Sequence, residues 1–146
     1  MMTGFSNYYA RAVANHFFRG DVESSAQSRP SELFLSLHSS DPTDDGDNNE
    51  ELEGGSYSRK LISFGQPDTD PDGAGFVTFI MNTTNIVFPN LPASVVSYIG
   101  IWTDRDAGEL LFSDNIYISA ATPTSIILNN GDSLSIPEGY LKIYIQ

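Results

Sequence analysis

Beyond Pro30, short apolar segments alternate with clusters of turn-forming residues, and this pattern restricts the fold more than any other feature of the chain. In residues 32–38, for example, Leu33, Leu35 and Leu37 alternate with other residues, as in a strand with one face in a core. About seven to nine such strands predict a mainly β protein, an antiparallel β-sandwich or barrel. The predicted strands lie at residues 32–38, 57–64, 76–81, 85–88, 95–102, 109–113, 115–119, 125–128 and 139–145.

Four segments give more local predictions. Residues 95–102 form the longest apolar run, which we expect to be a central strand. Residues 104–108 are a turn from which residues 109–113 return as the second arm of a hairpin. Residues 129–132 read Asn-Asn-Gly-Asp, a tight-turn signal between two strands. Residues 66–75 are rich in Asp, Pro and Gly, and we interpret them as an acidic connection without a strand.

The N-terminal segment contains one predicted amphipathic α-helix, at residues 6–19. Ser6 is a good N-cap residue, and Gly20 suits the position just past the last helical turn. Apolar residues recur every four positions, which places them on one side of the helix. We expect this aromatic face to be buried, either against the protein's own sheet or against a neighbouring subunit. Its members are Phe5, Tyr9, Val13 and Phe17.

Charge divides the chain at the same place as the predicted elements. The 146 residues carry 19 acidic and 7 basic side chains, a net charge of −12. Residues 1–30 carry three arginines against two acidic residues, a net of +1, so residues 31–146 carry a net of −13. Direct nucleic-acid binding is disfavoured, because such binding depends on neutralising phosphates. We therefore divide one domain into an N-terminal helix and arm, residues 1–30, and a β-sandwich body, residues 31–146.

The N-terminal arm is the predicted interface with partners. Its excess positive charge suits docking on an acidic surface, while the acidic body keeps free subunits apart and soluble. Both explanations, docking and simple solubility, remain open at this stage. The predicted interface residues are Phe5, Tyr9, Arg11, Val13, Phe17 and Arg19.

The chain shows no recognisable catalytic pattern. It contains no cysteine and two histidines, and it has neither a Gly-x-Ser-x-Gly elbow nor a phosphate-binding loop. Ser39, Ser40 and Asp41 follow His38, but neighbouring strand residues point to opposite faces and do not form a triad. We predict no enzymatic activity and no cofactor. No apolar run approaches the ~20 residues of a membrane span, so we expect no membrane contact.

One segment resembles part of a calcium loop. Asp68, Asp70 and Asp72, followed by Gly73, match its first half. The closing position is Phe79, where a bidentate glutamate is expected. We therefore predict no strong metal site and keep these three aspartates as a weak calcium candidate, with a polar turn as the alternative.

The connection between residues 39 and 55 is long and acidic. It holds seven acidic side chains and no basic one between Asp41 and Glu53. A loop of this length in a compact domain tends to be functional or mobile. It is either an exposed, repulsive loop or an arm that orders against a partner, and the sequence leaves both possibilities open.

Several short motifs, taken in order, resemble a known family. After the helix come Leu37-His38-Ser39-Ser40-Asp41-Pro42, then Gly54-Gly55-Ser56-Tyr57-Ser58-Arg59, then Asn82 with Ile86-Val87-Phe88-Pro89. Ile99-Gly100-Ile101-Trp102, Glu109-Leu110-Leu111-Phe112 and Asn130-Gly131-Asp132 with Gly139 follow. This order is similar to that of small tailed-bacteriophage proteins labelled tail-fibre or virion structural proteins. One difference is Ser39-Ser40, where that family has Thr-Ala.

The resemblance implies a structural subunit of a tailed-phage virion, assembled in the host cytoplasm. We favour a capsid cement (decoration) protein that stabilises the head shell and contacts the major capsid protein. The alternative is a tail or tail-fibre subunit, and a small hydrolase or carbohydrate-binding module is the third reading. In the first two cases we expect association with other copies of the chain, most simply as a trimer, because virion components commonly follow closed symmetry.

Overall fold

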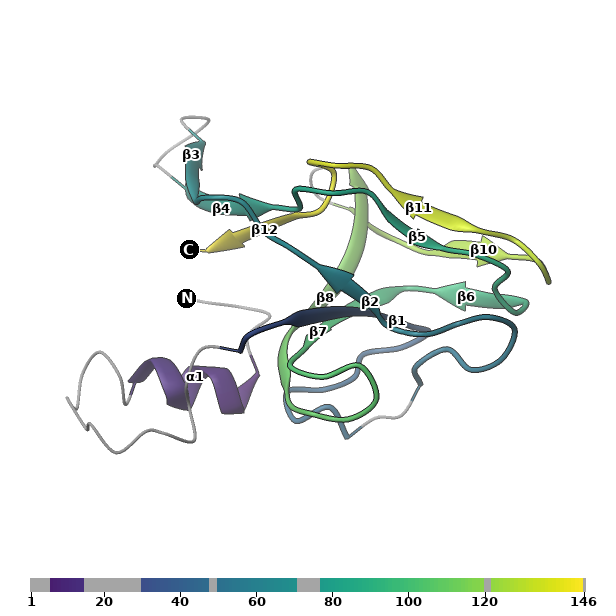
Figure 1. Ribbon diagram of the computed structural model, residues 1–146, viewed down its shortest axis with the longest axis horizontal. Helices are drawn as coiled ribbons and strands as arrows, with labels where there is room; N and C mark the ends of the chain where they lie inside the picture. Colours follow the sequence, from purple (N-terminus) through teal and green to yellow (C-terminus); the bar gives the residue numbers. More distant parts are fainter. Residues whose placement is uncertain (1–5, 15–29, 48–49, 71–76, 120–121, 146) are drawn as a thin grey trace.

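The computed structural model describes residues 6–14, 30–47, 50–70, 77–119 and 122–145. Within them it contains one helix and twelve strands, all paired antiparallel, which confirms the predicted mainly β fold (Figure 1). The elements are α1 (Asn7–Ala14), β1 (Leu33–His38), β2 (Lys60–Ile62), β3 (Asp68–Asp70), β4 (Val77–Met81), β5 (Ile86–Phe88), β6 (Ser94–Val96), β7 (Tyr98–Trp102), β8 (Leu110–Ser119), β9 (Thr122–Thr124), β10 (Ile126–Leu128), β11 (Leu134–Ile136) and β12 (Lys142–Ile145).

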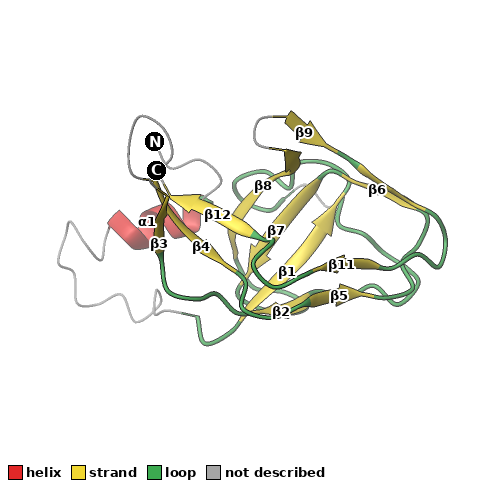
Figure 2. Ribbon diagram, turned by 90° about the horizontal axis from the view of Figure 1, so that it is seen from above, coloured by secondary structure: helices red, strands yellow, loops and turns green. Residues whose placement is uncertain are grey.

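The first layer is a five-stranded sheet with the order β2-β1-β7-β8-β9. Strand β7 lies in its middle, as expected for the most apolar run. Strands β7 and β8 form the predicted hairpin, and the intervening turn closes through Thr103, whose N–H donates to the carbonyl of Glu109 over 3.1 Å. Figure 2 shows β1, β7 and β8 side by side in this layer.

The second layer is a long two-stranded ribbon in which residues 78–96 run antiparallel to residues 126–145. It consists of the pairs β4–β12, β5–β11 and β6–β10, and β3 adds a third strand beside β4. The residue numbers of paired residues add up to 223 in β4–β12 and to 222 in β5–β11 and β6–β10. The register therefore shifts only once along the ribbon, by one residue, between β4–β12 and β5–β11. Representative pairs are Thr78 with Ile145, Ile86 with Ile136, and Val96 with Ile126.

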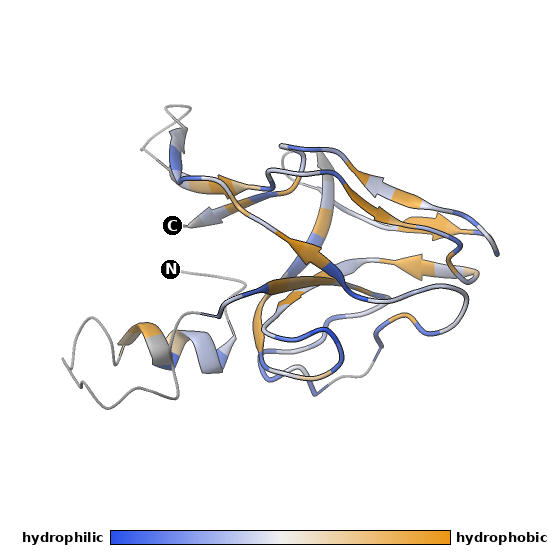
Figure 3. Ribbon diagram, viewed as in Figure 1, coloured by the Kyte–Doolittle hydropathy of each residue, from blue (hydrophilic) through white to orange (hydrophobic). Residues whose placement is uncertain are grey.

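The two layers enclose one apolar core. The sheet contributes alternate residues of β1, β7 and β8, and the ribbon contributes residues of β5, β6, β10 and β12. Figure 3 shows hydrophobic segments, in orange, along both layers. Period-2 alternation produces this arrangement, because every second side chain of a strand points to the same face. The fully buried members include Leu35, Leu37, Phe88 and Val96.

The strand boundaries differ from the predicted ones in several places. The run at residues 95–102 is two strands, because the chain passes from the ribbon to the sheet at Ser97. The segment that we interpreted as an acidic connection contains β3, which pairs with β4. The turn at residues 129–132 forms, but β10 and β11 on either side pair with β6 and β5 rather than with each other. Strands β9 and β11 were not among the predicted ones.

Helix α1 begins where the sequence places its N-cap. The Ser6 hydroxyl accepts a hydrogen bond from the N–H of Tyr9 over 3.2 Å, and the N–H of Ser6 donates to the carbonyl of Leu111 on β8. The first turn is thus attached to the protein's own sheet. Predicted helical residues 15–19 lie outside the described residues. No helix in the described part of the chain is long and apolar enough to cross a membrane.

Candidate functional site

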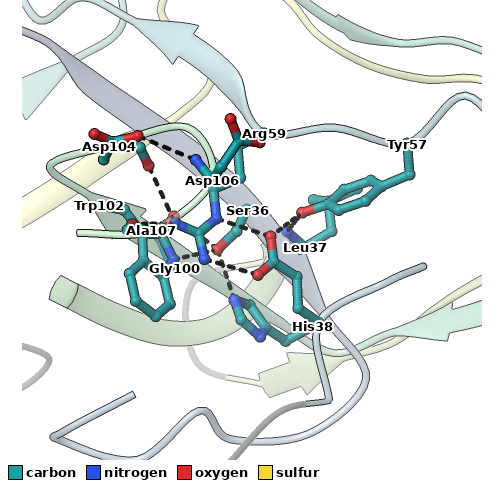
Figure 4. A network of polar contacts seen from close by, with 11 residues as sticks. Ser36, Leu37, His38, Tyr57, Arg59, Gly100, Trp102, Asp104, Asp106 and Ala107 are labelled. Atoms are coloured by element: carbon teal, nitrogen blue, oxygen red, sulfur yellow. Dashed lines mark hydrogen bonds and ion pairs between the residues drawn. The ribbon is translucent and has the colours of Figure 1, made fainter. Parts of the chain in front are cut away.

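The outer face of the five-stranded sheet, away from the core, carries a buried polar cluster (Figure 4). Strand β1 places Ser36 and His38 on this face, and neighbouring β7 contributes Gly100 and Trp102. A Cβ atom at Gly100 would lie 2.6 Å from the Ser36 hydroxyl, so glycine is required for this close approach. Ser36 is completely buried and His38 is 1% exposed.

The hydrogen bonds around Ser36 define the protonation of His38. The indole N–H of Trp102 donates to Ser36 Oγ over 2.8 Å, and Ser36 Oγ lies 3.3 Å from the Gly100 carbonyl, which can only accept. His38 Nε2 is 2.6 Å from the same hydroxyl. All of these bonds form together when Nε2 carries the proton and the Ser36 hydroxyl donates to Gly100, an assignment made from the network. His38 Nδ1 has no hydrogen-bond partner within the described residues.

Arg59 lies across this face and connects three separate segments. Its Nε and Nη2 donate to the two carboxylate oxygens of Glu51, each over 2.9 Å, which makes a bidentate ion pair. Its Nη1 donates to the carbonyls of Asp104 and Ala107 in the β7–β8 turn, over 3.1 and 2.9 Å. The guanidinium also lies 3.8 Å from the centre of the Trp102 ring, a cation–π contact.

Tyr57 completes the cluster beside the edge of β1. Its hydroxyl donates to Glu51 over 2.8 Å and accepts the N–H of Leu37 over 3.1 Å. Burial alone would raise the pKa of Glu51, but hydrogen bonds from Arg59 and Tyr57 outweigh it, and the pKa lies below its usual value. Burial also raises the pKa of Tyr57 and lowers the pKa of His38 from 6.5 to about 4. The cluster therefore holds one ion pair, Arg59 with Glu51, and a neutral imidazole.

Three of the motifs that carried the family resemblance meet in this cluster. The motif at residues 37–42 supplies His38, the motif at residues 54–59 supplies Tyr57 and Arg59, and the motif at residues 99–102 supplies Gly100 and Trp102. Their common role is to attach the loop before β2 and the turn after β7 to strand β1.

The paired glycines of the second motif have a separate structural role. Gly54 and Gly55 have φ angles of +102° and +56°, and a Cβ at Gly55 would lie 2.4 Å from the carbonyl oxygen of Asn90. Glycine is therefore needed where this loop passes the ribbon.

Asn82, from the motif that continues with Ile86-Val87-Phe88-Pro89, has a comparable role in the ribbon. It is 1% exposed and lies where the register shifts between β4–β12 and β5–β11. Its amide N donates to the carbonyls of Thr84 and Pro137 over 2.8 and 3.0 Å, and its Oδ1 accepts the N–H of Leu141 over 2.9 Å. The side chain thus satisfies backbone groups that a regular ladder would otherwise pair.

The acidic connection divides into two parts. Residues 50–52 return to the protein's own sheet, where Glu51 bridges to His38 and the N–H of Leu52 donates to the carbonyl of Leu37. Asp44 and Asp45 are exposed but receive hydrogen bonds from Asn7 of α1. Part of the loop is thus ordered by its own chain, an outcome that neither of the two sequence-based alternatives described.

Three of the predicted interface residues, Tyr9, Arg11 and Val13, lie on α1, apart from the polar cluster. Tyr9 and Val13 share one side of the helix and are half-buried, while Arg11 is exposed. Phe5, Phe17 and Arg19 lie outside the described residues. The sequence-based reasoning did not select the polar cluster as a site, although Arg59 among apolar neighbours was a signal for it.

The weak calcium candidate has a different conformation from the one that the motif suggested. Asp68 and Asp70 belong to β3, an extended strand paired with β4, whereas the corresponding positions of a calcium loop curl around the ion. Asp72 lies outside the described residues. Among the described residues, no group of three or more His, Asp or Glu side chains could hold a metal ion.

Comparison with known proteins identifies the family. Residues 4–144 match the family described as Podophage GP4 fiber I protein gp80. No curated protein shows significant similarity to the chain. The match covers the helix, the polar cluster and nearly the whole ribbon, and it agrees with the resemblance found in the sequence motifs. The chain therefore belongs to the family of the podophage GP4 fiber I protein gp80 and is a structural protein of the phage virion.

Proposed function

We propose that this protein is a non-catalytic subunit of a phage tail fibre. The observation that carries the proposal is the family match over residues 4–144, because the matched family is described as a fibre protein. The match includes every described element except the last residue of β12, so it concerns the whole fold and not an isolated motif.

The fibre reading replaces capsid cement as the preferred function. The cement reading rested on the acidic body and on the positively charged N-terminal arm. Both features suit a fibre subunit equally well, since any repeated virion part must avoid premature association. The family description favours the fibre.

A structural role also fits the chemistry of the polar cluster. A nucleophilic serine must reach its substrate, whereas Ser36 is completely buried and donates its proton to the Gly100 carbonyl. The Arg59 guanidinium uses its donors on Glu51 and on two backbone carbonyls. These contacts fix segments of the chain relative to one another, which is the requirement of a structural subunit.

For its partners we propose other copies of this chain, as a trimer, and other virion proteins. Helix α1 would provide a contact with the virion through exposed Arg11, because the first turn is already attached to its own sheet at Ser6. Tyr9 and Val13 lie about half a helical turn away from Arg11, so that side of α1 would supply a second, apolar contact. A partner surface with acidic groups would suit Arg11.

Immunogold labelling of purified virions tests the location. Antibodies raised against the purified protein should place gold on the fibres, and the same antibodies preabsorbed with the protein should place none. Gold distributed over the head shell would overturn the fibre proposal in favour of cement.

Particles made without the protein provide a second test. A stop codon at Tyr57 in the phage genome removes every described strand except β1, so the sandwich cannot form. The fibre proposal predicts particles that lose fibres and host adsorption but keep wild-type resistance to heat and chelator. Heads that release DNA more readily than wild type, with fibres intact, would instead support cement.

A further inference from the structure

The exposed face of the ribbon at β6 and β10 carries an apolar patch, Val95 and Ile127. These two residues are direct cross-strand partners, with 43% and 77% of their surfaces exposed. Their strand neighbours Val96 and Leu128 point the other way, into the core.

The patch is also the part of the molecule without charge. Residues 73–103 and residues 115–131 contain no Asp, Glu, Lys or Arg, in a chain of net charge −12. The first of these stretches supplies Val95, and the second supplies Ile127. The side chains beside the patch, Ser97 and Ser125, are neutral and polar and hydrogen-bond to each other.

A further feature is the edge of the ribbon at β10. In the described part of the chain β10 pairs with β6 alone. Natural sheet edges are commonly protected by lysine, proline or an inward-pointing charge. Ile126, Ile127 and Leu128 provide none of these, so no side chain of β10 protects the edge that borders the patch.

We infer that this patch is a self-association surface and that its occupant is a second copy of the chain. Two copies that each carry a net charge of −12 repel one another wherever acidic groups meet, and this patch is where they can approach without opposing carboxylates. The patch also lies at the end of the molecule opposite α1, as the position of β6 in Figures 1 and 2 shows. Contacts between copies therefore leave the helix available for other virion proteins.

The size of the patch determines the strength of association. A stable interface buries about 800 Å² on each partner, which two aliphatic side chains and a polar rim do not supply alone. The isolated chain should therefore associate weakly, with a dissociation constant of about 1–100 µM. Within a fibre, attachment to a common partner raises the effective concentration and completes the contact.

Sedimentation velocity of the full chain tests the inference. The sedimentation coefficient of the wild type should rise between about 5 and 300 µM, a range that brackets the expected dissociation constant. Ile127→Asp should keep the chain monomeric throughout, and Ile127→Thr, which keeps the β-branched side chain, should weaken association by about tenfold, as expected for 1.4 kcal/mol. The matched control is Leu61→Asp, since Leu61 on β2 is also a half-exposed aliphatic residue. This variant should associate like the wild type.

Circular dichroism confirms that each variant is folded, and salt provides a further readout. Screening of like charges should strengthen association as salt rises. Three results would overturn the inference: a wild type that remains monomeric, an Ile127→Asp variant that associates like the wild type, or association that weakens with salt.

The inference rests on the proposed function only in assuming a repeated subunit. Gold on the fibres with unchanged association of Ile127→Asp would refute the patch and leave the fibre proposal intact. Gold on the head, together with loss of association in Ile127→Asp, would refute the fibre proposal and leave the patch intact.

Discussion

Strand β1 is buried on both faces, but the two faces are stabilised by different interactions. Leu33, Leu35 and Leu37 pack into the apolar core, where contacts are non-directional and depend on the area removed from water. On the other face Ser36 and His38 belong to a network in which each donor requires one particular acceptor. The comparison separates two tasks, because the first face stabilises the sandwich and the second determines where the loops attach to it.

The apolar face should show the largest effect of a single substitution. Leu35→Ala leaves a cavity in a completely buried position and should lower the free energy of unfolding by about 4 kcal/mol. Urea unfolding measures this loss as a lower midpoint with an unchanged m-value. Val87→Ala, at an exposed position of the ribbon, is the matched control and should cost about 0.5 kcal/mol or less. Equal losses in the two variants would show that the core is not where the structure places it.

On the polar face, Arg59→Met should have the next largest effect. It removes the counter-ion of the Glu51 carboxylate, which keeps only the bond from Tyr57, and the side-chain donor of two backbone carbonyls, and it should cost about 3 kcal/mol. The double variant with Glu51→Gln should recover part of the loss, because no unpaired charge then remains. Arg105→Met serves as control, since Arg105 is exposed and should lose about 0.5 kcal/mol at most. An Arg59→Lys variant as stable as wild type would argue against the bidentate and stacked geometry.

The two faces should also differ in their response to pH. His38 has a pKa of about 4 in the folded protein, chiefly because of burial, against 6.5 ordinarily. The unfolded chain therefore binds more protons between these values, and stability falls as the pH falls through this window. From pH 7 to pH 5 the free energy of unfolding should decrease by about 2 kcal/mol from this group.

The His38→Gln variant isolates this contribution. Its stability should vary less between pH 7 and pH 5 than that of the wild type, whereas Leu35→Ala should keep the wild-type pH dependence. Below pH 4.5, protonation of Glu51 should lower the free energy of unfolding further in the wild type and in both variants, because the pKa of Glu51 is also lowered in the folded protein. A wild type whose stability is flat from pH 7 to pH 5 would show that His38 is not held neutral.

Gly100→Ala should give the smallest of the four effects. The added methyl group meets Ser36 Oγ at 2.6 Å and Trp102 Nε1 at 2.9 Å, and the resulting overpacking should cost about 1.5 kcal/mol. Ser36→Ala in the same chain removes the nearest atom, so the two losses should not add. Gly65→Ala, whose added Cβ comes no nearer than 3.3 Å to another atom, is the control in a thermal melt. Strict additivity of the Gly100 and Ser36 changes would contradict the close contact.

The sequence predicts the elements whose character is local. Alternating leucines identify β1, and the turn at residues 104–108 identifies the β7–β8 hairpin. Ser6 correctly marks the start of the helix because an N-cap is a property of a few adjacent residues. Periodicity cannot show that the run at residues 95–102 leaves one layer for the other at Ser97, because both halves are apolar and only distant partners distinguish them.

The polar cluster is unpredictable for the same reason. Its members come from four segments, and each residue alone has an ordinary explanation: His38 ends a strand, Trp102 belongs to an apolar run, and Glu51 lies in an acidic loop. Only the antiparallel pairing of β1 with β7 and the return of residues 50–52 bring them together. The predicted interface on α1, by contrast, follows from spacing within one helix, and its role remains a prediction.

The nearly constant register of the ribbon suggests an order in which its strands pair during folding. Its innermost pair, Val96 and Ile126, is separated by 30 residues of chain, and its outermost pair, Thr78 and Ile145, by 67. Closing a long loop costs entropy before any contact is gained, so pairing begins at the shorter separation. The β7–β8 hairpin lies between the two arms and brings Val96 and Ile126 together when it forms. We therefore expect pairing to spread outward from this point, with β4 and β12 pairing last.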